Sequence, residues 1–178
     1  MFLFSLSCTL TLVVGMALFA ARQSRAAVSP ARNESPRPLA QDPDYRAKVL
    51  VLESHADLRR IISLSLKRDY DVITVSSAAQ AKILLPTMKP DLILCDVELP
   101  DADGRSLCRR HKQHTGTADT PFVLMSVRPE NAMRISCMDA GADEFLLKPF
   151  HLTQLHECVA AHIRGRHHLL SYFQTSAQ

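Results

Sequence analysis

The chain has 178 residues, enough for one domain with extensions at its ends. Apolar residues make up 47% and charged residues 22%, which are ordinary values for a globular protein. The net charge of +3 is small, and Lys and Arg form no basic stripe with interleaved aromatics, so we predict no nucleic-acid partner. The five cysteines form no CxxC pair and no metal-ligand spacing, which favours small buried side chains in a reducing compartment.

Residues 1–46 differ in composition from the rest of the chain. Residues 1–21 form a hydrophobic segment, and 22–46 is a proline-containing stretch predicted to be a disordered linker. Arginines follow the segment, so as a membrane anchor it would leave the C-terminal side in the cytoplasm, at the inner membrane. A cleaved signal peptide and a false upstream start of translation are the two alternatives.

From residue 47 to about 165, short apolar runs alternate with amphipathic stretches. The runs have the length and composition of strands buried on both faces of a parallel sheet. Ser77 can cap a helix, and Pro129 and Gly141 can bracket another. We therefore predict a doubly wound α/β domain of parallel βαβ units. The expected strands are Val49–Leu52, Val72–Val75, Leu92–Cys95, Phe122–Met125 and Phe145–Leu147. Helices are expected to begin near Asp57, Ala78, Glu130 and Leu152, and a further, shorter helix contains Leu107. The first helix is expected to bury Leu58, Ile61, Ile62 and Leu66. The last is expected to bury Leu155, Val159 and Ile163 and to end at Arg164.

Four of the predicted strands end in residues that can act on a phosphoryl group. They are the pair Glu53-Ser54, then Asp96, Ser126 and Lys148. Taken singly, an Asp after an apolar run is most often a cap, and a Lys before Pro is usually a solvated turn. The predicted fold, however, brings these strand ends to one edge of the sheet, where ligands of such sheets bind.

These residues and their spacing resemble the receiver domain of bacterial response regulators over about 118 residues. The matching stretches are KVLVLESHADLRRI, PDLILCDVELPDADG, TPFVLMSV and AGADEFLLKPF. The resemblance implies a flavodoxin-like (βα)5 fold with strand order 2-1-3-4-5. It also implies two-component phosphorelay signalling rather than enzymatic turnover, with a sensor histidine kinase or phosphotransfer protein as the phosphoryl donor.

The same resemblance implies the roles of individual residues. Asp96 would be the phosphoacceptor that forms a 4-aspartylphosphate, while Lys148 and Ser126 would bind the phosphoryl oxygens. Phe145 stands where the family has an aromatic that swings inward on phosphorylation. Mg²⁺ would be held by Glu53, Asp96 and the backbone carbonyl of Glu98.

The sequence departs from the family at Ser54, where a second adjacent acid normally ligates the metal directly. A neutral serine should weaken Mg²⁺ binding, because Mg²⁺ prefers carboxylate oxygens. Glu53 could reach the metal in its place, or could pair with Lys148 and leave the site without metal. The alternative function is therefore a degenerate receiver that acts as an interaction module independent of phosphorylation.

A third hypothesis is a phosphatase with an aspartyl nucleophile, since Glu98 lies two residues after Asp96, but Pro100 and Gly104 suit the receiver loop better. His55 is expected in an exposed loop. The other histidines near the C-terminus do not recur at i, i+4, which favours a solvated surface over a metal site. Residues 166–178 are predicted to be a tail too short for an output domain. A homodimer stays open, and the sequence identifies no downstream partner.

Overall fold

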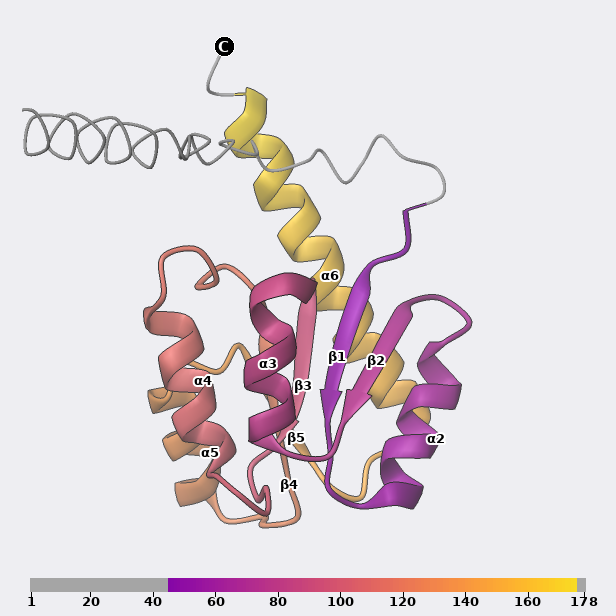
Figure 1. The fold of residues 1–178 in the computed structure, drawn as a ribbon, viewed down its shortest axis with the longest axis vertical. Helices are drawn as coiled ribbons and strands as arrows, with labels where there is room; N and C mark the ends of the chain where they lie inside the picture. Colours follow the sequence, from indigo (N-terminus) through magenta and orange to yellow (C-terminus); the bar gives the residue numbers. More distant parts are fainter. Residues whose placement is uncertain (1–44, 176–178) are drawn as a thin grey trace, which may run out of the picture. The chain divides into compact units, whose positions relative to one another are not determined.

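The computed structural model describes residues 45–175, with side chains described as far as residue 166. Within this range five strands alternate with five helices (Figure 1). In chain order the elements are β1 (Lys48–Leu52), α2 (Ala56–Leu66), β2 (Asp71–Val75), α3 (Ala78–Met88), β3 (Leu92–Asp96), α4 (Gly104–Gln113), β4 (Phe122–Ser126), α5 (Asn131–Asp139), β5 (Glu144–Leu147) and α6 (Leu152–Thr175).

The five strands form one parallel sheet in the order β2-β1-β3-β4-β5, which confirms the predicted flavodoxin-like topology. The strand order reverses beside β1, because the chain first adds β2 on one side and then β3, β4 and β5 on the other. In this class of sheet, ligands bind outside the carboxyl ends of the strands at such a point. The topology therefore places the expected ligand site at the loops after β1 and β3.

The helices cover both faces of the sheet, and each face has its own hydrophobic core. Helices α3, α4 and α5 pack over one core, whereas α2 and α6 pack over the other (Figure 1). Alternate residues of β1 divide between the two, with Leu50 and Leu52 on the α3 side and Val49 and Val51 on the α2 side. Burial on both faces explains why the strands are continuous apolar runs rather than alternating ones.

The observed strands match the predicted ones to within one residue at each end. The predicted buried face of α2 was wrong at one position. Ile61 was expected on the buried face of α2, but its side chain is 50% exposed. Ile62 and Leu66, four residues apart, point into the core. Ile61 lies about 100° around the helix from Ile62, which carries it to the flank.

The last helix is longer than expected, because α6 continues through Gly165 to Thr175 instead of ending at Arg164. A single glycine inside a helix costs about 1 kcal/mol relative to alanine, which does not suffice to end one. Arg166 also holds this part of the helix against the domain. Its Nη1 donates to the carbonyl of Pro90 at 2.8 Å and lies 3.7 Å from Asp91 Oδ1. Much of the predicted tail is therefore helical.

The predicted hydrophobic segment 1–21 and nearly all of the predicted linker 22–46 lie outside the described residues. None of the helices described is both long enough and apolar enough to span a bilayer.

Candidate functional site

The site forms where the carboxyl ends of four neighbouring strands meet. Glu53 directly follows β1, Asp96 is the last residue of β3, Ser126 ends β4, and Lys148 directly follows β5. The backbone N–H of Lys148 donates to the Ser126 carbonyl at 2.7 Å, so hydrogen bonding between the two chains continues one step past β5. The sheet thus brings the residues predicted for phosphoryl chemistry to one edge.

Lys148 lies between two carboxylates. Its Nζ is 2.5 Å from Glu53 Oε2 and 3.0 Å from Asp96 Oδ2. All three side chains are at most 10% exposed, and buried charges are tolerated when they are paired in this way. Burial raises the pKa of the Asp96 carboxyl, Lys148 opposes that rise, and the nearby Glu53 adds to it. The three groups carry a net charge of −1 when all are ionised.

Glu53 has both of its carboxylate oxygens engaged. Oε2 contacts Lys148, and Oε1 accepts a hydrogen bond from the backbone N–H of His55 at 3.0 Å. Of the two arrangements expected for Glu53, the structure contains the ion pair with Lys148. Ser54 beside it is half-buried, and the side chain of His55 is exposed, as predicted for that histidine.

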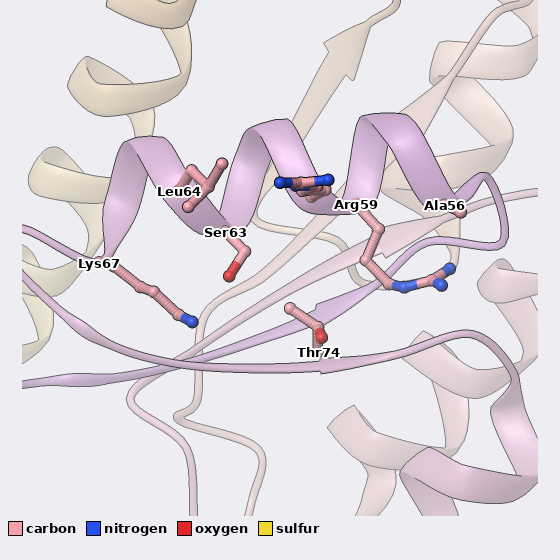
Figure 2. Close-up of a pocket in the computed structure, with 7 residues that line it drawn as sticks. Ala56, Arg59, Ser63, Leu64, Lys67 and Thr74 are labelled. Atoms are coloured by element: carbon pink, nitrogen blue, oxygen red, sulfur yellow. The ribbon is translucent and has the colours of Figure 1, made fainter.

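Arg59 is a residue of this region that sequence reasoning missed. From the first turn of α2, its Nη1 donates to the backbone carbonyls of Glu53 and Ser54 at 2.6 and 2.9 Å. It therefore fixes the loop that presents Glu53. Arg59 also lines a surface pocket beside Ser63, Lys67 and Thr74 (Figure 2). Nothing in the spacing of an arginine six residues after Glu53 signals such a backbone contact.

Ser126 and Phe145 are both buried, at 1% and 9% exposure. The Ser126 hydroxyl oxygen accepts a hydrogen bond from the backbone N–H of Arg128 at 3.1 Å. Phe145 packs in the core on the α3 side of the sheet, together with Met133 and Cys137 of α5. The aromatic expected to act with Ser126 thus points into the domain.

The chain packs tightly against the Asp96 backbone where the loop after β3 enters α4 at Gly104. A Cβ atom on Gly104 would lie 2.2 Å from the Asp96 backbone carbonyl oxygen, so only glycine allows this approach. Asp96 Oδ1 accepts from the backbone N–H of Glu98 at 3.2 Å. The Glu98 side chain instead points to the rim, where its Oε1 lies 2.8 Å from Arg128 Nε.

The family model for the response regulator receiver domain matches residues 49–160 of this chain. The chain belongs to this family. It is 35% identical over 111 residues to the transcriptional regulatory protein KdpE of Staphylococcus aureus, covering 62% of this chain and 47% of that protein. It is 32% identical over 103 residues to the phosphate regulon regulator PhoB of Pseudomonas aeruginosa, covering 57% of this chain and 45% of that protein.

Solved receiver structures share the fold. A putative response regulator from Chloroflexus aurantiacus aligns with a TM-score of 0.65 at 27% identity, covering 67% of this chain and 99% of that one. The BeF3-activated N-terminal receiver domain of RstA from Klebsiella pneumoniae aligns with a TM-score of 0.60 at 29% identity, covering 66% and 98%. This receiver domain spans about half the length of the curated relatives named above.

The family implies Mg²⁺, and the donor chemistry of this site suits it. The carboxylates of Glu53 and Asp96 and the hydroxyl of Ser54 all offer oxygen, which Mg²⁺ prefers, and the net negative charge favours a cation. This set contains two carboxylates. The family pattern, with two adjacent acids and the phosphoacceptor aspartate, supplies three. Mg²⁺ therefore fits, with one charged ligand fewer than the family pattern provides.

Proposed function

We propose that this receiver module accepts a phosphoryl group on Asp96 from the phosphohistidine of a sensor kinase or phosphotransfer protein. The observation that carries the proposal is the Lys148 ammonium group, 3.0 Å from the Asp96 carboxylate at the strand edge where ligands of this fold bind. Because such a kinase would take its phosphoryl group from cytoplasmic ATP, the proposed transfer to Asp96 would take place in the cytoplasm.

In the proposed reaction an Asp96 carboxylate oxygen attacks phosphorus as the P–N bond to the histidine breaks, and the histidine nitrogen keeps the bonding electrons. Lys148 already lies beside the carboxylate, so it can follow the charge onto the phosphoryl oxygens. The Ser126 hydroxyl would bind another of these oxygens. Bound Mg²⁺, held by Asp96, Glu53 and the Glu98 carbonyl, would neutralise negative charge on the phosphoryl group.

The matching experiment is a Mg²⁺ titration of the full chain with and without beryllofluoride, a phosphoryl mimic. A working site couples the two ligands, so we expect beryllofluoride to tighten Mg²⁺ binding in the wild type and not in Asp96→Asn. Asp119→Asn is the control, because Asp119 is an exposed aspartate between α4 and β4. Mg²⁺ binding that is identical with and without beryllofluoride would overturn the proposal.

A second function, docking without phosphorylation, is favoured by one observation. Both carboxylate oxygens of Glu53 are engaged by Lys148 and the His55 N–H, and the neighbouring Ser54 is neutral. A module of this kind would bind its partner equally well as wild type and as Asp96→Asn. A phosphoacceptor would show different partner affinity with and without beryllofluoride, and this difference would vanish in Asp96→Asn.

A further inference from the structure

Three side chains lie close together on the face formed by β5 and α6, outside the site at Asp96. Glu144 is the first residue of β5, and Cys158 and His162 lie one turn apart on α6. Residues four apart in a helix share one face, so both α6 side chains point the same way. One potential ligand atom from each of the three lies within 4.8 Å of the other two, and His162 Nε2 is 3.4 Å from Glu144 Oε2.

These distances suit a small tetrahedral cation. Zinc bonds of about 2.0 to 2.3 Å hold neighbouring ligand atoms roughly 3.3 to 3.8 Å apart. The His162–Glu144 separation already falls in this range. The widest pair needs to close by at most about 1 Å, which rotation of the partly exposed Glu144 side chain can supply.

The donor types select among metals. One sulfur, one imidazole nitrogen and one carboxylate oxygen match the ligands of Zn²⁺, whereas Mg²⁺ and Ca²⁺ take oxygen donors. With Cys158 as thiolate, Glu144 ionised and His162 neutral, the ligands carry a charge of −2, which a divalent ion balances. Without a metal, burial first and then Glu144 raise the pKa of the Cys158 thiol to about 12.

The proposed metal site is open to solvent on one side and packed against the domain core on the other. The His162 and Glu144 side chains are 22% and 42% exposed, which leaves room for water as a fourth ligand. Cys158 is partly buried and packs against the core that α6 shares with the sheet. A metal here would therefore tie α6 to β5, the strand at the edge of the sheet.

We propose that Glu144, Cys158 and His162 form a Zn²⁺ site on the β5–α6 face, independent of the phosphoacceptor pocket. The C-terminal histidines are predicted to lie on a solvated surface, but His162 is only 22% exposed and contacts Glu144. Histidine spacing alone does not reveal the cluster, because the residue four before His162 is a cysteine and the third ligand comes from another element.

The test uses Co²⁺ and Zn²⁺ with the reduced full chain. Tetrahedral Co²⁺ bound to thiolate gives a charge-transfer band in the near ultraviolet and intense visible bands, and Zn²⁺ should displace it. We expect these bands in the wild type and their loss in Cys158→Ser. Glu144→Gln and His162→Gln should each weaken Zn²⁺ binding at least tenfold, since even outer-shell changes cost about 10- to 100-fold.

His156→Gln is the matched control, because His156 lies on α6 outside the cluster, and Asp96→Asn tests independence from the phosphoacceptor pocket. Both variants should bind Zn²⁺ as the wild type does. Zn²⁺ should also raise the melting temperature of the wild type but not of Cys158→Ser. The absence of a thiolate–cobalt band, or a band that survives in Cys158→Ser, would overturn the proposal.

Discussion

Ser54 stands where the family resemblance leads one to expect a second acid, and its replacement tests what the neutral side chain costs in metal affinity. In Ser54→Asp a carboxylate returns beside Glu53 and Asp96, so we expect Mg²⁺ to bind about tenfold or more tightly, because a nearby opposite charge contributes several kcal/mol before desolvation. Ser54→Asn, similar in size and neutral, should leave the affinity close to wild type. Equal affinity in all three proteins by calorimetric titration would show that position 54 does not face the ion.

Asp96 is expected to reduce stability, since burial raises the pKa of its carboxyl. The folded protein then holds the Asp96 proton more tightly than the unfolded chain does. The free energy of unfolding of the wild type should therefore fall, relative to Asp96→Asn, as the pH rises from the ordinary aspartate pKa through the raised one. We expect Asp96→Asn to be the more stable protein at pH 7 in urea unfolding. A wild type that gains stability over the variant with rising pH would contradict this.

His111 gives the domain a second dependence on pH. Its ring packs on Phe122 with centroids 5.6 Å apart, and its Nε2 has no hydrogen-bond partner among the described residues. Burial first, then the positive charges of Lys112 and Arg166, lower the His111 pKa to about 4. The folded protein thus keeps this ring neutral where the unfolded chain protonates it.

Acidification from about pH 6.5 to 4 should therefore cost up to about 3 kcal/mol of unfolding free energy through His111. In His111→Leu this part of the pH dependence should disappear, while the exposed His151→Leu keeps it. Urea unfolding at several pH values in this interval measures the effect. Parallel curves for wild type and His111→Leu would refute it.

At the scale of elements, the close approach of the β3–α4 loop to Asp96 depends on Gly104. A methyl group there would collide with the Asp96 carbonyl, so Gly104→Ala should cost about 1–3 kcal/mol of stability, as overpacking commonly does. Gly165→Ala is the opposite case. It lies inside α6 with nothing described within 4 Å of an added Cβ, and it should add about 0.5–1 kcal/mol. Denaturant unfolding that ranks the two variants alike would contradict this account of the loop.

The strands could be predicted closely, because burial on both faces leaves a continuous apolar run such as Val49–Leu52. The end of α6 could not, since Arg166 is held by Pro90 and Asp91, residues 75 or more positions away in the chain. Helix faces were predicted less accurately than strands. The apolar residue at position 61 fits the helical pattern almost as well as Ile62, but the sheet accommodates only one of them.

For the whole molecule, the topology explains why the candidate site was predictable as a set of residues. Once the parallel strand order is known, the residues at the carboxyl ends of β1, β3, β4 and β5 must share one edge of the sheet. The pairing within the site was not predictable, because a side chain as long as that of Glu53 could reach either a metal or Lys148. Arg59 and the Glu144, Cys158 and His162 cluster were missed because contacts between elements, not spacing, create them.

The proposed role of Asp96 is to accept a phosphoryl group in spite of the neutral residue at position 54. The most direct measurement is the intact mass of the full chain after incubation with acetyl phosphate or phosphorylated kinase and Mg²⁺, followed by peptide mapping. We predict a gain of one phosphoryl group, located in the peptide that contains Asp96, absent in Asp96→Asn and retained in Asp119→Asn. No gain with either donor, or a gain that persists in Asp96→Asn, would contradict this role.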